Sequence, residues 1–267
     1  MEAVFEPDAD GQVLLRRDGA IATVTLNRPE RRNALSLAAN RRLHALWDEI
    51  DADPGIRAVV LTSADCGTFC AGMDLKEAAA LRAATGKDIL DLLEDPFYER
   101  LRAVRVPVIA AMTGHFTAGG MVLAANADLR VGLAGTSGGI TEARVGRGTP
   151  WAAPMVAMLP LAVLMEMAVT AQLLPVERLY ALGFVNAVEA TPAAVRAKAA
   201  DYARVIAANA PLSVAAAKAG LSASVDLGAH AGYAVSKARH REVYASADAI
   251  EGPLAFAEKR PPHWQGR

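Results

Sequence analysis

Two glycine turns, each of which follows an apolar run, constrain the fold of this 267-residue chain more than any other feature. The first turn contains Gly72 and follows Ala58–Leu61, and the second contains Gly119 and follows Val106–Met112. Short apolar runs that end in a glycine turn are typical of buried strands that lead into helices. We therefore expect two strand–turn–helix units, in which the N–H groups at both helix starts are free to donate hydrogen bonds.

Strand-like and helix-like patterns alternate on both sides of these turns. Val13–Leu15 and Ile21–Leu26 flank an Asp-Gly pair, which predicts a β-hairpin. Ser36 can cap the helix that follows, and a helical, partly charged segment is expected over Leu75–Val104. Alternation of this kind is typical of layered α/β folds, so we predict that class.

The chain changes character after Pro150, where it becomes rich in alanine and helical in pattern. The apolar stretch Ala152–Leu174 has the length of a membrane span, but two prolines and Glu166 interrupt it. Two short helices are therefore expected there. The helical C-terminal part is interpreted as a packing or assembly layer on the α/β core.

The composition excludes several classes of protein. The chain is 53% hydrophobic with a formal net charge of −1, whereas nucleic-acid-binding proteins normally carry a clear basic excess. Its two cysteines, Cys66 and Cys70, form neither a disulfide framework nor a zinc ligand set. The acidic N-terminus lacks the apolar run of a signal peptide. A cytoplasmic protein that binds neither nucleic acid nor membrane is therefore expected.

Three motifs occur in a fixed order along the chain. The first is Leu26–Leu35 (LNRPERRNAL), and the second is Phe69–Leu75 (FCAGMDL). The third is Thr113–Glu142, which contains the second glycine turn. In this order and spacing, the motifs resemble the crotonase superfamily, the enoyl-CoA hydratase/isomerase family. The resemblance extends from about Leu14 to Lys259.

The resemblance implies the fold and its division into two parts. A spiral of ββα units, the ClpP/crotonase fold, is expected over residues 1–200, and a C-terminal helical assembly region over residues 201–267. Members of the family form homotrimers or hexamers made of two trimers, so the same assembly is expected for this chain.

The resemblance also places catalytic groups on this sequence. The two N–H donors of the family's oxyanion hole fall on Met73 and Gly119, where they would bind the thioester oxygen of an acyl-CoA substrate. The family's first catalytic glutamate falls on Val122, three residues after Gly119. The second falls on Glu142, fourteen residues beyond Asp128. One of the two acids is therefore absent.

The same resemblance implies contacts with coenzyme A, which enters as part of the substrate; no other cofactor and no metal is expected. The walls of the acyl pocket are expected from Leu75–Val104 and Gly148–Trp151. In the family, an aromatic residue and a cation of the C-terminal helix approach coenzyme A, often from a neighbouring subunit. The positions predicted to contact coenzyme A are Arg28, Arg31, Ala71, Gly72, Asp74, Leu75, Lys76, Phe256 and Lys259. For the basic side chains near the first two motifs, a solvated charged face is the alternative.

The loss of one acid narrows the expected chemistry. Hydration of a C2–C3 double bond requires an activated water and a proton for C2, and two carboxylates divide these tasks well. Moving a double bond from C3 to C2 requires one group that takes a proton from C2 and returns it to C4. Glu142 alone can do this, so an isomerase-type reaction is favoured. Hydration by Glu142 alone stays open, and His115 or Asp74 could assist it.

Three alternatives accompany this interpretation. Glu142 could form an ion pair with Arg144 or Arg147 instead of a raised-pKa base. The chain could also be an acyl-CoA-binding protein that lost its chemistry with the missing glutamate. Residues 135–139 match the G-x-S-x-G pattern of serine hydrolases, with Ser137 as nucleophile and Asp226 and His230 or His240 as partners. That pattern requires a helix directly after the serine, and none is expected here.

Overall fold

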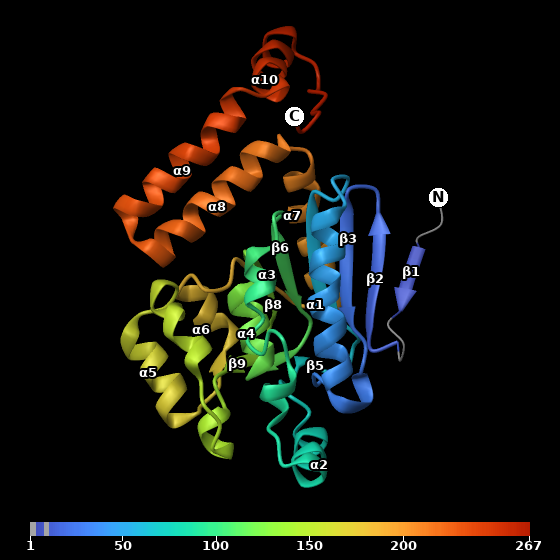
Figure 1. Ribbon diagram of the computed structural model, residues 1–267, viewed down its shortest axis with the longest axis vertical. Helices are drawn as coiled ribbons and strands as arrows, with labels where there is room; N and C mark the ends of the chain where they lie inside the picture. The colour runs from blue at the N-terminus through green and yellow to red at the C-terminus, as the bar shows by residue number, and fades with distance from the viewer. Residues whose placement is uncertain (1–3, 8–10) are drawn as a thin grey trace.

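A seven-stranded sheet forms the centre of the molecule, of which the computed structural model describes residues 4–7 and 11–267 (Figure 1). Its order is β1-β2-β3-β4-β6-β8-β11. The first three strands are antiparallel, which confirms the hairpin, and the other neighbours are parallel. The strands are β1 (Val4–Pro7), β2 (Val13–Asp18), β3 (Ile21–Leu26), β4 (Ala58–Ser63), β6 (Val108–Met112), β8 (Leu129–Leu133) and β11 (Ala187–Glu189).

A second, four-stranded sheet has the order β10-β9-β7-β5. Its members are short: β5 (Thr68–Cys70), β7 (His115–Thr117), β9 (Ser137–Gly139) and β10 (Leu174–Pro175). Three successive strand pairs, β4 with β5, β6 with β7 and β8 with β9, each place one strand in each sheet. Within both sheets these strands are parallel to their counterparts. The chain therefore repeats one unit along two sheets, and this is the expected spiral.

Helices cover both faces of the large sheet, which explains the continuous apolar runs of its parallel strands. α1 (Leu37–Ala52) is capped by Ser36, whose Oγ accepts a hydrogen bond from Ala39 N at 3.0 Å, as the sequence predicts. α7 (Pro192–Ala207) packs on the other face. Alternate sheet residues face the two helices, and those in the cluster with α7 are Ala58, Val60, Ile109, Ala111 and Val131.

The segment Leu75–Val104 is not one helical stretch. It contains α2 (Leu75–Thr85), the 3-10 helix η2 (Ile89–Leu92) and α3 (Glu99–Ala103). Gly86 ends α2 because it adopts φ +73°, a conformation that terminates helices and suits glycine. α2 buries none of its residues, so little apolar packing holds it against the core.

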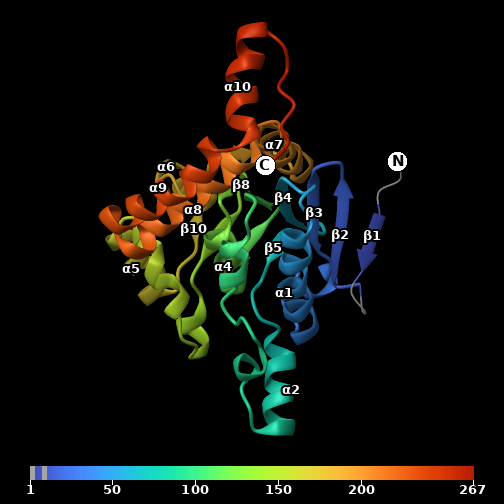
Figure 2. The same cartoon turned by 45° about the horizontal axis from the view of Figure 1, so that its top comes forward.

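The C-terminal part is helical, as predicted. After the short helices η3 (Glu142–Val145), η4 (Pro150–Ala157), α5 (Leu161–Thr170) and α6 (Val176–Ala181), the chain returns to the large sheet at β11 and then forms α7. Residue 200, the expected boundary, lies within α7. α8 (Pro211–Leu227), α9 (Ala229–Tyr244) and α10 (Ala247–Glu258) follow. In both overall views, α10 lies at the opposite end of the molecule from α2 (Figures 1 and 2).

Among the described residues, no single helix is long and apolar enough to cross a membrane. α7 and α8 meet the length and composition requirements only as a pair bent by 111°. The apolar stretch Ala152–Leu174 contains two short helices, η4 and α5, as the sequence predicts.

α4 (Gly119–Asn126) approaches β5 so closely that only a glycine fits between them. A Cβ added to Gly120 would lie 2.3 Å from the carbonyl oxygen of Cys70 and 3.0 Å from its carbonyl carbon. Because both contacts are with backbone, the strand could not move aside without disturbing the small sheet. Gly120 therefore fixes the distance between the second glycine turn and β5.

We predict that Gly120→Ala destabilises the protein by about 1–3 kcal/mol through overpacking. Helix propensity alone predicts the opposite sign, since alanine is favoured over glycine by about 1 kcal/mol in a helix. Thermal unfolding decides between the two effects. Gly148→Ala is the matched control, because its added Cβ would meet only Pro150 Cδ at 3.8 Å. A Gly120→Ala variant that melts at or above the wild-type temperature would contradict the close approach.

Candidate active site

A pocket of about 190 Å³ lies where the two glycine turns meet. The turns supply its floor, η3 and η4 supply one wall, and the segment between α2 and α3 supplies the other. One wall comes from the predicted segment Leu75–Val104, whereas the other extends beyond the predicted Gly148–Trp151 to include η3. The lining residues are Ala71, Met73, Leu75, Leu90, Pro96, Phe97, Tyr98, Ala118, Gly119, Val122, Thr141, Glu142, Arg144, Val145, Arg147, Gly148 and Trp151.

The two turns are in direct backbone contact. Gly72 has φ +88°, and a Cβ added there would lie 2.7 Å from Ala118 Cβ and 3.0 Å from Gly119 N. From the other side, a Cβ on Gly119 would lie 3.1 Å from Gly72 Cα. Glycine is required at position 72 both for its left-handed φ and for this contact. Two segments far apart in the sequence are thus joined at the floor of the pocket.

The orientation of the peptide between Gly72 and Met73 follows from a hydrogen bond to the first motif. Leu35 N donates to Gly72 O at 2.8 Å, and Asp74 N donates to Leu35 O at 3.0 Å. Because the two polar groups of a trans peptide point in opposite directions, anchoring the Gly72 carbonyl on Leu35 turns the Met73 N–H away from it. This N–H has no acceptor within the described part of the chain, and Met73 lines the pocket.

The peptide between Ala118 and Gly119 is fixed in the same way. Val122 N donates to Ala118 O at 3.0 Å, so the Gly119 N–H points away from the helix that it begins. Ala118 itself has φ +50° and ψ −119°, which is strained for a residue with a Cβ. Such strain is found where the surrounding structure imposes it, often at functional sites. The Gly119 N–H also has no acceptor among the described residues.

Glu142 is the one carboxylate in this pocket lining. It is buried, and burial raises its pKa, although the nearby N–H groups of the Glu142 and Thr141 backbone and the Trp151 indole oppose the rise. Trp151 Nε1 donates to Oε1 at 3.1 Å, while the buried Oε2 has no hydrogen-bond partner. A buried carboxylate oxygen without a partner is costly and suits a group that accepts a proton or a water from a ligand.

The alternative ion pairs of Glu142 are not formed. Arg147 instead makes a bidentate pair with Asp88, with Nη1–Oδ2 at 2.5 Å and Nη2–Oδ1 at 2.7 Å. This pair joins the two walls of the pocket and holds the pKa of Asp88 well below its usual range. Val122, at the position of the family's other glutamate, is buried and lines the same pocket.

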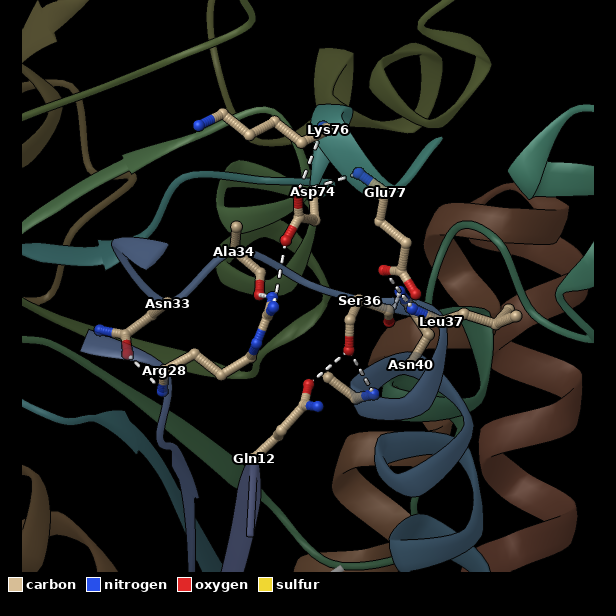
Figure 3. Close-up of polar contacts among 11 residues, drawn as sticks. Gln12, Arg28, Asn33, Ala34, Ser36, Leu37, Asn40, Asp74, Lys76 and Glu77 are labelled. Carbon is tan, nitrogen blue, oxygen red and sulfur yellow. Dashed lines mark hydrogen bonds and ion pairs between the residues drawn. The ribbon is translucent and has the colours of Figure 1, made fainter. Parts of the chain in front are cut away.

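Asp74 and Arg28 belong to the scaffold below the pocket, where Figure 3 shows them pointing toward each other. Asp74 caps α2 by accepting from Lys76 N and Glu77 N at 3.2 and 3.3 Å. Burial alone would raise the pKa of Asp74, but the Glu77 N–H and the Arg28 guanidinium outweigh it and lower the pKa. Arg28 also donates to Ala34 O at 2.5 Å. Neither residue lines the pocket.

The other residues predicted to contact coenzyme A fall in two places. Ala71 and Leu75 line the pocket, whereas Gly72 is buried against the second turn, and Arg31 and Lys76 are exposed. The Lys76 side chain extends away from the polar network (Figure 3). Phe256 and Lys259 lie at the end of α10, remote from α2 and the pocket within one chain (Figures 1 and 2). The structure therefore does not bring these two to the site of their own chain.

The residues of the alternative mechanisms are not assembled. His115 is exposed on β7, outside the pocket, and its Nδ1 accepts from Ser137 N at 3.0 Å. Asp226 pairs with Arg102, and His240 Nδ1 lies 2.8 Å from Ser236 O within α9. His230 is exposed at the start of α9, and no long helix follows Ser137.

Two structural contributions were not predicted from the sequence. Asn33 is buried and donates to Ala64 O and Thr68 O at 2.9 and 2.8 Å, which holds the first motif over the small sheet. Tyr98 lines the pocket and donates through its hydroxyl to Asn40 on α1. The first motif is rich in polar and charged residues, so nothing in its composition distinguishes Asn33 as the buried one. Tyr98 lies between η2 and α3, where the sequence predicts a continuous helical segment.

Within the described residues, no group of three or more histidine, cysteine or acidic side chains is arranged to hold a metal ion. A family model described as enoyl-CoA hydratase/isomerase matches residues 16–267. The chain belongs to the enoyl-CoA hydratase/isomerase family. Its members are acyl-CoA enzymes, so the expected family is confirmed.

Curated relatives and solved structures agree with this family assignment. The chain is 34% identical to enoyl-CoA hydratase EchA19 of Mycobacterium tuberculosis, over 98% of this chain and 97% of that protein. It is 32% identical to (E)-benzylidenesuccinyl-CoA hydratase of Thauera aromatica, over 95% and 99% respectively. The crystal structure of an enoyl-CoA hydratase from Bacillus anthracis superposes with a TM-score of 0.89 at 27% identity, covering 96% of this chain and all 100% of that one. The crotonase fold is thereby confirmed.

We predict that Gly72→Ala destabilises the protein by about 1–3 kcal/mol. Alanine is strained at this positive φ, and its methyl group would clash with Ala118 Cβ. A double-mutant cycle with Ala118→Gly tests the contact, since that change removes the nearest atom from the added methyl group. The double variant should recover at least about 0.5 kcal/mol of the loss. Additive effects of the two substitutions in denaturant unfolding would contradict the contact between the turns.

Proposed function

We propose that this protein is an acyl-CoA isomerase-type enzyme that moves a double bond from C3 to C2 through a thioester enolate. The observation that carries the proposal is the single buried carboxylate, Glu142, in a pocket where Val122 takes the place of the second acid. The substrate supplies coenzyme A, and the chemistry requires no further cofactor.

The enolate is stabilised at the floor of the pocket. When C2 loses a proton, negative charge develops on the thioester oxygen. The N–H groups of Met73 and Gly119 are both without acceptors and both line the pocket, so they can donate to that oxygen. Fixed donors of this kind are worth about 3 kcal/mol each in the transition state. Their rigidity follows from the hydrogen bonds that anchor the two peptides.

Glu142 transfers the proton. Its free Oε2 removes the proton from C2 of a 3-enoyl-CoA and forms a dienolate, and the same oxygen then delivers the proton to C4. One carboxylate is thus the base in the first half and the acid in the second. Burial supports both roles, because a raised pKa makes the free energies of the protonated and ionised carboxyl more similar at neutral pH.

Hydration is the second candidate, because several relatives are named as hydratases, among them EchA19 and (E)-benzylidenesuccinyl-CoA hydratase. In that reaction Glu142 would exchange both protons through one water. Val122 offers no second carboxylate to divide the work, which is why isomerisation is preferred. The two reactions differ in the mass of the product, since hydration adds one water molecule and isomerisation adds nothing.

The test is a panel of 2-enoyl-CoA and 3-enoyl-CoA thioesters of several chain lengths, with products identified by mass. We expect conversion of 3-enoyl-CoA to its conjugated isomer without change of mass. When the reaction is run in deuterated water, part of the ¹H that Glu142 removes from C2 should appear at C4 of the product, because one carboxylate carries it between the two carbons. Water addition as the faster reaction would favour the hydratase, and binding without turnover on any thioester would favour the non-catalytic alternative.

Glu142→Gln should lower kcat by roughly 10²–10⁴-fold, because it removes the proton-transfer group while keeping its shape. Binding of a saturated acyl-CoA, measured by calorimetry, should change little. Glu242→Gln is the matched control, since Glu242 is exposed on α9 and lies outside this pocket. Wild-type turnover by Glu142→Gln would eliminate the proposed base.

We also propose that the chain assembles as a homotrimer or a dimer of trimers. Large apolar side chains are exposed on α5 and on the helices after α7, a distribution typical of interaction surfaces. Phe256 is 87% exposed, and it could reach a pocket only across a contact between subunits. The most exposed members of this set are Leu161, Val169, Leu221, Tyr244, Ile250 and Phe256.

Light scattering should therefore give the mass of three or six chains at micromolar concentration. Ile250→Asp, which places a charge on the exposed face of α10, should shift the population toward smaller species. A wild-type monomer under these conditions would contradict the proposed assembly and leave the roles of Phe256 and Lys259 without support.

A further inference from the structure

The indole of Trp151 is the only side chain of the described structure that hydrogen-bonds to the Glu142 carboxylate. Its Nε1–H donates to Oε1 at 3.1 Å. The two residues lie on successive 3-10 helices, Glu142 at the start of η3 and Trp151 near the start of η4. Both line the pocket, so the contact is made at the site and not behind it.

This contact makes the two carboxylate oxygens different. Oε1 is occupied by the indole, whereas Oε2 is buried and has no hydrogen-bond partner. A hydrogen bond to one oxygen restricts rotation of the carboxylate group, so the other oxygen stays in one orientation relative to the pocket. A ring as large as indole, fixed by its own packing in the wall, holds that direction better than a flexible donor would.

We propose that Trp151 is a positioning residue for Glu142, which holds one carboxylate oxygen so that the other is presented to the reacting carbon. The inference rests on the proposed role of Glu142 as proton-transfer group. Trp151 does not touch the reacting atoms in this mechanism; it acts only through Glu142. The same N–H favours the ionised carboxylate, which is the form that accepts a proton.

The uncharged nature of the donor is part of the argument. A guanidinium on Oε1 would hold the carboxylate strongly in its ionised form and weaken it as a base. The other ionisable groups that line the pocket are Tyr98, Arg144 and Arg147. Arg147 is paired with Asp88, and burial raises the pKa of Tyr98 well above its usual value. Glu142 is therefore the group expected to titrate within the pocket in the range of the assay.

Trp151→Phe is the decisive variant, because it removes the N–H and keeps an aromatic ring in the wall. Glu142 must be ionised to accept a proton, so activity falls as the pH drops through its pKa. Without the N–H, this pKa should rise, and the acidic limb of the kcat/KM profile should move up by about one pH unit. We expect kcat to fall about tenfold above the limb, with KM changed less than twofold.

Phe97→Leu is the matched control for packing. Phe97 lines the same pocket and its side chain makes no hydrogen bond to Glu142. The acidic limb of the kcat/KM profile of Phe97→Leu should therefore stay at the wild-type pH, even if the rate itself changes. A Phe97→Leu limb that shifts as far as that of Trp151→Phe would assign the effect to packing and overturn the inference.

A spectroscopic titration separates this inference from the proposed function. The chain has three tryptophans, and the emission of Trp151 is the difference between wild type and Trp151→Phe. That difference should change as Glu142 ionises and should be independent of pH in a Glu142→Gln background. The positioning role would be overturned if the Trp151 emission did not change with pH when Glu142 is present. It would also be overturned if the acidic limb of Trp151→Phe stayed at the wild-type pH. Full activity of Glu142→Gln would instead overturn the proposed function.

Discussion

The backbone contact between Gly72 and Gly119 is the constraint on which the rest of the site depends. A Cβ on Gly119 would lie 3.1 Å from Gly72 Cα, so the two turns meet without side chains between them. This approach is possible because β5 and β7 are neighbours in the small sheet and end at the same edge. The spiral of repeated units therefore places two helix starts together, and their free N–H groups are a property of the topology before any side chain contributes.

The chemistry of the pocket comes from a division between polar scaffold and apolar lining. Leu35, Asn33, Asp74 and Arg28 fix the peptides through hydrogen bonds outside the pocket. Inside it, the Met73 N–H, the Gly119 N–H and Oε2 of Glu142 have no hydrogen-bond partner among the described residues. Each of these groups can bind a ligand, because its partner group in the same peptide or carboxylate is the one that forms the internal hydrogen bond. The low polarity of the surroundings strengthens whatever they bind.

The sequence predicted the turns, the α/β class and the residues of the floor because each depends on local patterns or on motif spacing. Ser36, Gly72 and Gly119 are recognisable from their immediate neighbours. The breaks within Leu75–Val104 were missed, since charged and apolar residues alternate there much as in a helix. The partners of Glu142 could not be predicted either. Whether Arg147 pairs with Glu142 or with Asp88 depends on how two walls that are far apart in the sequence pack in space. The periodicity of the sequence contains no information about that packing.

The two walls and the floor of the pocket are held by different forces. α2 buries none of its residues, and the wall that follows it is tied to the opposite wall by the Arg147–Asp88 pair. Partly exposed ion pairs contribute little to global stability compared with backbone packing such as that at the floor. Exposed residues of α2 can therefore be replaced with little effect on folding. Changes there alter the rim of the pocket, where Leu75 lies, and leave unchanged the floor at which we propose that an enolate is stabilised.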